Sequence, residues 1–478
     1  MASSTRSADE PPAIVWFRDD LRLSDNPALT EAAASGVPLV ALYVLDDAAM
    51  GDWRPGGASR WWLHLSLSSL AADLAACGVP LVLRRGAAEI VLPALIAETG
   101  ATAVYWNRLY EPWAVRRDGE IKARLRAEGV KAESFNASLL FETSALRTTQ
   151  GDPYRVFTPF WRACLARPAP EAPLPVPARL RGATAPESER LKDWRLLPKK
   201  PDWAGGLREA WTPGESSAQA RLADFAAKGA ARYRESRNAL GEDGVSRLSP
   251  HLHFGEISPR QVWTAIAAQA GEAGAPYHRQ LGWREFSRHL LFANPDLPAI
   301  PLDKSFARFP WREDKQQLQA WREGRTGYPL VDAAMRELWR TGYMHNRARL
   351  VAGSFLVKHL LIHWRAGEDW FWDTLVDADL ANNANSWQWV AGCGADAAPY
   401  FRVFNPMLQG EKFDPEGCYV RRYVPELAGL EAKWIHHPWE APKPLLEAAG
   451  VRLGESYPLP IVDHARARAR ALAAYAER

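Results

Sequence analysis

VPLVALYVL, residues 37–45, is a short apolar run that follows a glycine and precedes two aspartates. Such a run predicts a buried β-strand. Three further runs have the same character, namely AIVWF (13–17), VPLVLRRG (79–86) and AVYWN (103–107). Helix-like segments separate them, such as SRWWLHLSLSSLAADLAACG (59–78), which ends on a glycine as helices commonly do. Alternating strands and helices predict an α/β, doubly wound parallel sheet in the N-terminal part of the chain.

The expected sheet lacks the usual phosphate-binding loops. No G-x-G-x-x-G pattern opens a helix after the first strand, and no G-x-x-x-x-G-K-[ST] pattern occurs anywhere in the chain. We therefore expect this sheet to bind its ligand through other contacts.

A proline-rich segment, RPAPEAPLPVP (167–177), marks a break between domains, because its five prolines do not fit inside a helix or a central strand. From about residue 205 onward, strand signals fade and helical periodicity dominates. The sequence therefore predicts an α/β N-terminal domain over 12–140, an interdomain linker over 141–204 and an all-α C-terminal domain over 205–478.

Composition limits the classes of protein that this chain can belong to. A chain of 478 residues with 47% hydrophobic and 24% charged residues predicts a globular protein of two domains. The net charge of +3 permits a nucleic-acid partner without arguing for one. The four cysteines form no C-x-x-C pair, so we expect no metal site. No leader or membrane span is recognisable, so we expect a cytoplasmic protein.

The periodic segment GYMHNRARLVAGSFLVKHLLIHW (342–364) predicts one long helix. Asn346, Arg349 or Leu350, and Gly353 would share a face of it. A glycine inside a helix marks either tight packing against another helix or the approach of a flat ligand. A buried Arg349 needs an acidic partner, for which Asp377 and Asp379 are candidates, although all of these groups could equally be solvated at a helix end.

Several histidine patterns resemble known motifs only weakly. His359 and His363 are four residues apart, but no glutamate follows the first, so a solvated helix face is favoured over a zinc site. His251 and His253 have no further ligands nearby, and capping or structural roles are favoured. GCGADA (392–397) matches a loose dinucleotide pattern without the strand and crossover unit that it requires.

Five long blocks together resemble the photolyase and cryptochrome flavoprotein family. They are VWFRDDLRLSDNPAL at the start, SRLSPHLHFGEISPRQVW (246–263), LGWREFSRHLLF (281–292), TGYPLVDAAMRELWRTGYMHNRAR (326–349) and WQWVAGCGADAAPYFRVFNPMLQGEKFDP (387–415). The blocks occur in order along nearly the whole chain, and they resemble bacterial cyclobutane pyrimidine dimer photolyases, including the class III group. The resemblance implies an α/β antenna domain joined to a helical domain that holds FAD.

The resemblance also implies which residues hold FAD. Arg349 and Asp377 match a pair beside the flavin, Asp379 matches a position on the adenine side, and Asn383 matches the residue that faces flavin N5. Photolyases usually carry asparagine there and plant cryptochromes aspartate, which favours repair over signalling. The remaining cofactor positions are Tyr233, Val245, Ser246, Arg247, Leu248 and Ser249, which match a phosphate and ribityl grip, together with Gln280, Arg284 and Asn346.

Two tryptophans in SWQWV match different roles in the family. Trp387 matches the flavin-proximal member of an electron relay that continues through Trp364 to Trp311, whereas Trp389 matches one wall of the slot for a flipped-out lesion, with Trp283 as the other wall. Ordinary core packing is the alternative for such rings. The positions that match contacts to the lesion or to DNA phosphates are Arg237, Asn346, Arg347, Gln409 and Lys412, and their cationic members suit a phosphate backbone.

One position departs from the family pattern. Gln280 stands where dimer photolyases usually carry a glutamate, and an amide cannot supply an acidic proton. Glutamine there also occurs in (6-4) photolyases, but these carry histidines at the positions of Asn346 and Leu350, so (6-4) repair is disfavoured. The resemblance thus implies a light-driven enzyme that repairs dimers in UV-damaged DNA, with a blue-light photoreceptor of cryptochrome type as the alternative. We expect the protein to be a monomer.

The antenna position is open. Trp113 and Ala114 replace a polar pair that some dimer photolyases use for methenyltetrahydrofolate. The sequence does not choose between this folate, a deazaflavin and no antenna chromophore. The sequence ends about fifty residues after EGCYVRRYVPEL, and we expect no long polar output tail of the kind that many photoreceptors have.

Overall fold

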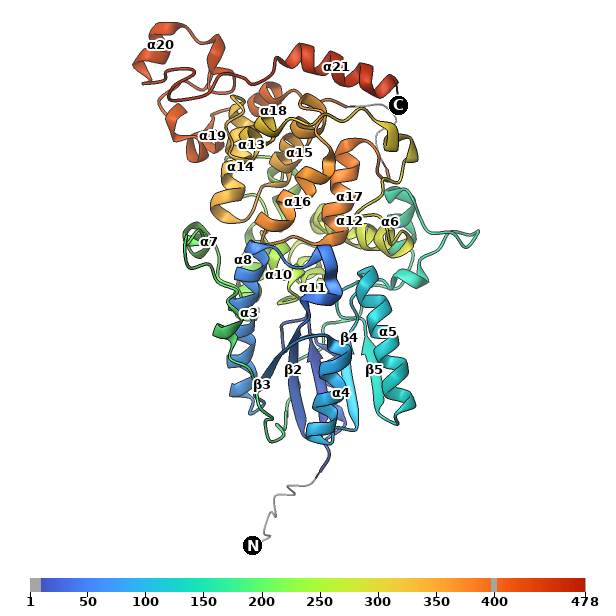
Figure 1. The fold of residues 1–478 in the computed structure, drawn as a ribbon. Helices are drawn as coiled ribbons and strands as arrows, with labels where there is room; N and C mark the ends of the chain where they lie inside the picture. Colours follow the sequence, from blue (N-terminus) through green and yellow to red (C-terminus); the bar gives the residue numbers. More distant parts are fainter. Residues whose placement is uncertain (1–9, 397–401, 478) are drawn as a thin grey trace.

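The computed structural model describes residues 10–396 and 402–477 (Figure 1). Residues 1–9, where we expected no leader, lie outside this part of the chain, as does Ala397 at the end of the GCGADA pattern. The α/β domain lies in the lower half of the view, and the helical domain lies above it.

A five-stranded parallel sheet forms the N-terminal domain, with strand order β3-β2-β1-β4-β5. The strands are β1 (Ala13–Phe17), β2 (Leu39–Leu45), β3 (Leu81–Arg85), β4 (Ala103–Asn107) and β5 (Lys131–Phe135). The four predicted strands are confirmed. Sequence reasoning missed β5 because this edge strand, KAESF, has only one fully buried side chain and therefore lacks the apolar signature of a central strand.

Helices cover both faces of the sheet. They are α1 (Pro27–Ala34), α3 (Gly57–Ala76), α4 (Ala88–Thr99) and α5 (Pro112–Ala127), and a short helix, α2 (Asp47–Met50), follows β2. Val15 and Phe17 of β1 pack with α1 and α3, whereas Ile14 and Trp16 pack with α4 and α5, as expected when successive side chains of a strand point to opposite faces. The predicted doubly wound arrangement is thereby confirmed.

The segment after the sheet returns to its edge. It carries helix α6 (Phe157–Leu165) and then runs without regular structure past its prolines. Gly182 pairs with Leu39 of β2, and a Cβ on Gly182 would lie 2.1 Å from the Gly78 carbonyl oxygen, so only glycine fits there. Ser188 accepts a hydrogen bond from the main chain of β3, and Trp194 lies buried in the core beneath the sheet.

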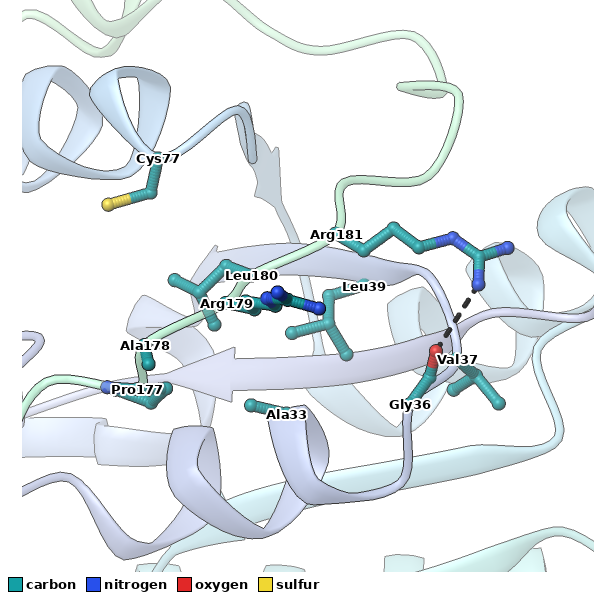
Figure 2. A pocket seen from close by; sticks show the side chains of 10 residues that line it. All are labelled: Ala33, Gly36, Val37, Leu39, Cys77, Pro177, Ala178, Arg179, Leu180 and Arg181. Carbon is teal, nitrogen blue, oxygen red and sulfur yellow. Dashed lines mark hydrogen bonds between the residues drawn. The ribbon is translucent and has the colours of Figure 1, made fainter. Parts of the chain in front are cut away.

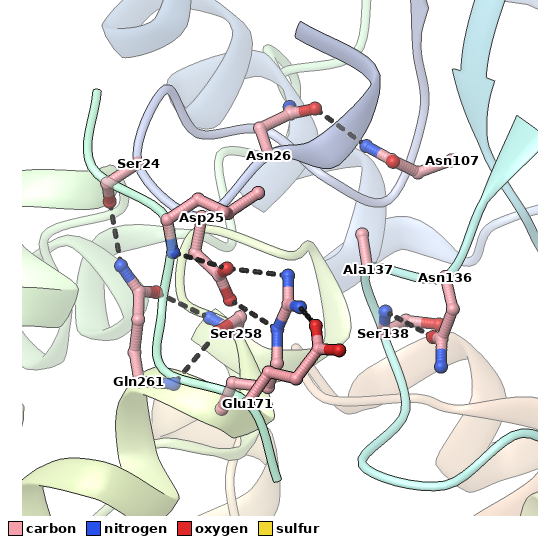
Figure 3. A network of polar contacts seen from close by, with 12 residues as sticks. Ser24, Asp25, Asn26, Asn107, Asn136, Ala137, Ser138, Glu171, Ser258 and Gln261 are labelled. Atoms are coloured by element: carbon pink, nitrogen blue, oxygen red, sulfur yellow. Dashed lines mark hydrogen bonds and ion pairs between the residues drawn. The ribbon is translucent and has the colours of Figure 1, made fainter. Parts of the chain in front are cut away.

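A buried ion pair ties three parts of the chain together (Figure 3). Asp25, which follows β1, accepts hydrogen bonds from Arg260 of the helical domain at 2.6 and 3.1 Å. Its Oδ1 also accepts from the main-chain nitrogen of Leu174, in the proline-rich segment. A second contact across the same interface runs from Gln261 to Ser24 at 2.7 Å. The two domains therefore share one polar seam.

The helical domain contains fifteen α-helices within the described residues. They are α7 (Gly205–Ala210), α8 (Glu215–Lys228), α9 (Tyr233–Ser236), α10 (Ser249–His253), α11 (Pro259–Ala270), α12 (Ala275–Ala293), α13 (Lys315–Arg322), α14 (Pro329–Thr341), α15 (Asn346–Ser354), α16 (Trp364–Thr374), α17 (Leu380–Ala391), α18 (Pro406–Phe413), α19 (Cys418–Tyr423), α20 (Lys443–Ala448) and α21 (His464–Ala476). Only isolated bridges interrupt this all-α character among these residues.

The single helix predicted over 342–364 is wrong. Gly342, with φ of +65°, ends α14, and α15 begins after His345, whose side chain caps it. Helix α15 passes into a π-helical turn, η7 (Phe355–His359), and Leu361 then adopts a φ of +55° that no helix tolerates. Ile362 pairs with Arg312 instead of continuing the helix. The apolar periodicity persists across these breaks because α15 and η7 bury side chains in the same core.

Candidate functional site

An acidic side chain, Asp377, organises the centre of the helical domain. It lies between α16 and α17 and accepts two hydrogen bonds from Arg349 of α15, at 2.8 and 3.0 Å. The Ser249 hydroxyl donates to Oδ2 of the same carboxylate at 2.6 Å. Asp377 is 9% exposed, so the alternative of a solvated helix end does not apply. Of the two predicted partners of Arg349, the structure selects Asp377.

The second candidate, Asp379, has a different partner. Its side chain caps α17 by accepting from Asn382 and also accepts from Arg288 of α12 at 2.5 Å. Burial opposes its ionisation, but Arg288, His253 and Arg284 outweigh that effect and hold the pKa of Asp379 below its ordinary value. Sequence reasoning missed Arg288, although it lies one turn after Arg284 in the block LGWREFSRHLLF.

The run Val245–Ser249 lies beside Tyr233 and Tyr277. The Ser246 hydroxyl and the Tyr277 hydroxyl are 2.8 Å apart, and the rings of Tyr233 and Tyr277 meet edge to face. Arg247 has a φ of +51°, which is costly for a residue with a side chain, and its buried Nε has no hydrogen-bond partner among the described residues. Leu248 is fully buried and anchors the run.

Helix α12 contributes Gln280, Trp283 and Arg284. Arg284 donates to the Ser138 carbonyl at 2.6 Å, while its buried Nη2 is unpartnered within the described chain, and burial lowers its pKa to about 10. Trp283 stacks on Phe157 of α6 with ring centroids 3.7 Å apart and remains half-buried. Gln280 is half-buried one turn earlier on the same helix. Phe157 was not predicted, because nothing in its local sequence distinguishes it from core.

Asn383 has a fixed orientation. Its Nδ2 donates to the main-chain carbonyl of Glu368 at 3.1 Å. A carbonyl only accepts, so the amide nitrogen must face Glu368 and the Oδ1 atom is directed elsewhere. Asn383 is 7% exposed, and α16 thus holds its side chain in a single pose.

Trp387 of α17 is packed against two glycines. A Cβ on Gly367 of α16 would lie 2.1 Å from its ring, and one on Gly353 of α15 would lie 3.6 Å from it and 3.3 Å from Val390. Of the two predicted reasons for a glycine at position 353, tight helix packing and the approach of a flat ligand, these contacts favour tight packing. Phe371 and Trp321 also contact the indole, with centroids 4.9 and 6.2 Å away.

The outer members of the predicted relay lie together. Trp364 is 1% exposed and stacks with His363 at 5.4 Å, and His363 meets the half-buried Trp311 at 5.1 Å. Trp389 is half-buried in the last turn of α17 and donates to the Asp396 carbonyl at 3.2 Å. Trp387 and Trp389 thus have different surroundings despite their spacing.

Two of the predicted DNA-contacting residues meet at one ring, and a third lies over another ring. Arg347 and Lys412 lie over Phe413 at 4.3 and 5.4 Å, and Arg347 also donates to Asn238 at 2.8 Å. Arg237 lies over the Tyr233 ring at 5.5 Å. Asn346 and Lys412 are exposed, whereas Gln409 is half-buried with an unpartnered Oε1 within the described residues. Sequence reasoning missed Phe413 and Asn238.

Of the histidines, His359 contradicts our prediction. It is fully buried and hydrogen-bonded to His464 of α21 at 2.9 Å, because α21 packs over the π-helical turn. His363 caps α16, and His251 lies buried against Glu256 at 2.5 Å. Within residues 10–396 and 402–477, no group of three or more His, Cys, Asp or Glu side chains is placed to bind a metal, and no helix is long and apolar enough to cross a membrane.

A separate groove of about 600 Å³ lies on the α/β domain (Figure 2). It is bounded by α1, α3 and residues 177–181, and Arg181 donates across it to the Gly36 carbonyl at 3.3 Å. None of the predicted site residues lines it.

Known proteins resemble this chain along nearly its whole length. Residues 13–178 match the family described as DNA photolyase, and residues 277–477 match the FAD binding domain of DNA photolyase. The deoxyribodipyrimidine photo-lyase of Agrobacterium fabrum is 52% identical over 470 residues, which cover 97% of this chain and 98% of that protein. The chain belongs to the photolyase/cryptochrome family.

Both branches of the photolyase/cryptochrome family contain similar proteins. Cryptochrome-1 of Arabidopsis thaliana is 42% identical over 96% of this chain and 69% of its own length. A solved bacterial class III photolyase from Agrobacterium tumefaciens has a TM-score of 0.95 at 52% identity, covering 100% of this chain and 99% of that one. The predicted fold and the FAD-binding character of the helical domain are thereby confirmed.

In this photolyase/cryptochrome chain, ion pairs link the carboxyl ends of β1 and β2 to helix α5. Arg18 contacts Asp118 at 2.5 Å, and Arg117 contacts Asp118 at 2.8 Å and Asp46 at 3.1 Å. Ala114 of α5 is fully buried, and Trp113 lies beneath the Arg117 guanidinium at 4.9 Å. These groups occupy the part of the sheet where α/β domains commonly bind ligands.

Proposed function

We propose that the chain is a light-driven DNA repair enzyme that splits cyclobutane pyrimidine dimers with an electron from photoexcited, reduced FAD. The observation that carries the proposal is the end-to-end likeness to the Agrobacterium deoxyribodipyrimidine photo-lyase. A blue-light photoreceptor is the second candidate, and the similarity to a plant cryptochrome supports it. Asparagine rather than aspartate at position 383 favours repair.

The described residues fit FAD. Arg284 Nη2 is a buried donor without a hydrogen-bond partner among the described residues, and Arg247 Nε has only the Asp243 carboxylate at 3.5 Å. An unsatisfied buried donor is costly unless a ligand accepts its hydrogen bond. Arg349 is fixed by Asp377 and thus presented in one orientation. We assign cofactor binding to Tyr233, Val245–Ser249, Gln280, Arg284, Asn346, Arg349, Asp377 and Asn383, with Asp379 acting by fixing Arg288 and the start of α17.

The cofactor supplies the light-driven electron, and the protein supplies position and environment. Asn383 presents a carbonyl oxygen, because its amide nitrogen is committed to Glu368, and this oxygen can accept a hydrogen bond from a reduced flavin nitrogen. Trp387, Trp364 and Trp311 lead from the interior of the domain toward the half-buried edge, as a relay for photoreduction requires.

A lesion has to leave the base stack before it can reach such a site. Trp283, backed by its stack on Phe157, and Trp389 offer ring faces for the two bases. Arg237, Arg347 and Lys412 supply cations for DNA phosphates, and Asn346 and Gln409 supply amides. Gln280 can hydrogen-bond the carbonyls of the lesion but cannot give them an acidic proton.

We further propose that the enzyme acts as a monomer in the cytoplasm. All four cysteines are free thiols, which suits a reducing compartment. For the antenna, we propose that a folate or a deazaflavin would contact groups other than Trp113 and Ala114, because these offer one buried methyl group and one indole already covered by Arg117.

The test is repair of a defined lesion by the FAD-loaded, chemically reduced protein. We expect dimers in a UV-irradiated thymine oligonucleotide to disappear under blue light and to persist in the dark, as measured by chromatography. The matched control is Trp387→Phe, which should block photoreduction of oxidised FAD and leave repair by chemically reduced protein largely intact. Light-induced spectral changes without loss of any dimer would place the chain among the photoreceptors.

A further inference from the structure

The carboxyl group of Glu368 is isolated in the interior of the helical domain. Its side chain is 0% exposed, and neither carboxyl oxygen has a hydrogen-bond partner within residues 10–396 and 402–477. The nearest cation, Arg365 Nε, lies 3.9 Å from Oε2, which is beyond hydrogen-bond distance. A buried carboxylate without donors is strongly disfavoured. Burial accordingly raises the pKa of Glu368 to about 9, with Arg365 opposing the shift and Asp369 adding to it.

Glu368 lies among the groups that we assign to electron transfer. The preceding residue, Gly367, touches the Trp387 ring, and Phe371, one turn later, meets the same ring at 4.9 Å. The main-chain carbonyl of Glu368 anchors Asn383. The backbone of Glu368 is therefore placed beside both the proposed electron donor and the proposed partner of the flavin ring. Sequence reasoning did not single out this residue.

Unpartnered polar atoms at such a place indicate a missing partner. A neutral carboxyl group carries one donor and one acceptor, and interiors rarely leave both unused. No structural hydrogen bond of the described chain employs them, so a purely architectural role leaves the carboxyl group unexplained. A ligand whose proton affinity rises when it gains an electron would be a suitable partner. It could take the proton from this buried, neutral acid.

We propose that Glu368 is the proton reserve for photoreduction of the flavin. An electron passes from Trp387 to the oxidised flavin, the O–H bond of Glu368 breaks, and an N–H bond forms on the flavin. A thiol reductant in solution then returns an electron to Trp387 through Trp311 and Trp364. Arg365, whose side chain is 32% exposed, compensates the carboxylate until water returns a proton. The proposal rests on the proposed relay function and adds the source of its proton.

The experiment compares the FAD-loaded protein with Glu368→Gln and with Asp369→Asn, the neighbouring exposed acid on α16. Light-minus-dark infrared spectra should show loss of one carboxylic acid C=O band in the parent protein and in Asp369→Asn, but not in Glu368→Gln. Transfer of a proton to the flavin, followed by visible absorbance, should slow about 100-fold in Glu368→Gln alone, which is the usual effect of losing a general acid.

Two results would overturn the proposal. One is a parent protein whose photoreduction bleaches no carboxylic acid band, which needs no variant and so does not depend on folding. The other is proton transfer at the parental rate in Glu368→Gln. Repair by chemically reduced Glu368→Gln should be unaffected, because that reaction takes no net proton. Failure of repair in all proteins would refute the proposed function and leave the infrared result standing.

Discussion

Replacing Gly367 by alanine should displace Trp387. The added Cβ would lie 2.1, 2.5 and 2.6 Å from three carbons of the indole ring. Ordinary carbon contacts are about 3.5–4.0 Å, so the ring has to move by roughly 1.5 Å. Overpacking of this kind costs about 1–3 kcal/mol, and alanine regains about 1 kcal/mol of helix propensity. We expect a net loss of up to about 2 kcal/mol in the free energy of unfolding.

Gly353→Ala is the matched control, because this glycine also lies inside a helix against Trp387. Its Cβ would meet Val390 at 3.3 Å and the indole only at 3.6 Å, so shifts of a few tenths of an ångström suffice. Gly353→Ala should therefore be neutral or slightly stabilising, by at most about 1 kcal/mol. Urea unfolding at fixed FAD concentration measures both values, and photoreduction kinetics report the position of the ring. Equal stabilities, with parental photoreduction in Gly367→Ala, would refute this packing argument.

The other predictions concern DNA, the lesion and pH. Removal of Arg347 or Lys412 should weaken binding to damaged DNA and lower the slope of log affinity against log salt by about one, and unchanged slopes in both variants would exclude the proposed DNA path. Gln280→Glu should raise the quantum yield for dimers without creating (6-4) repair, provided that the new acid is partly protonated in its half-buried position. Burial, followed by the nearby arginines, lowers the pKa of His345 to about 4. Unfolded histidine titrates near 6.5, so stability should fall as pH drops from about 6.5 to 4, and His345→Asn, which can still cap α15, should flatten this fall in urea titrations.

Much of the α/β domain could be predicted because its strands are short, apolar and fully buried, as in β1 and β4. Strand β5 escaped because an edge strand needs few apolar side chains. The break between α15 and α16 escaped because the apolar spacing continues through it, while a residue with positive φ and a pairing with Arg312 end the helix. Periodicity reports burial, and the backbone path depends on contacts from far along the chain.

The candidate site, like the fold, could be predicted from the sequence only in part. The sequence supplied Arg349 and two acidic partners, but only the fold assigns Asp377 to Arg349 and Asp379 to Arg288. The residues that sequence reasoning missed, Phe157 and Phe413, are ordinary aromatics whose value depends on which ring or cation meets them. Glu368 is distinguished only by its carboxyl oxygens, which are buried and have no hydrogen-bond partner among the described residues.

The contacts of residues 182–194 with the sheet affect when the N-terminal domain can fold during synthesis on the ribosome. Gly182 pairs with β2, Ser188 and Glu189 bond to Leu83, and Trp194 joins the core beneath the sheet. We propose that a fragment cut at residue 140 exposes the β2 and β3 backbone and the underside of the sheet, and is degraded or aggregates. A fragment that continues to about residue 204 should stay monomeric and resist limited proteolysis, so the N-terminal unit would mature only after its linker has been synthesised.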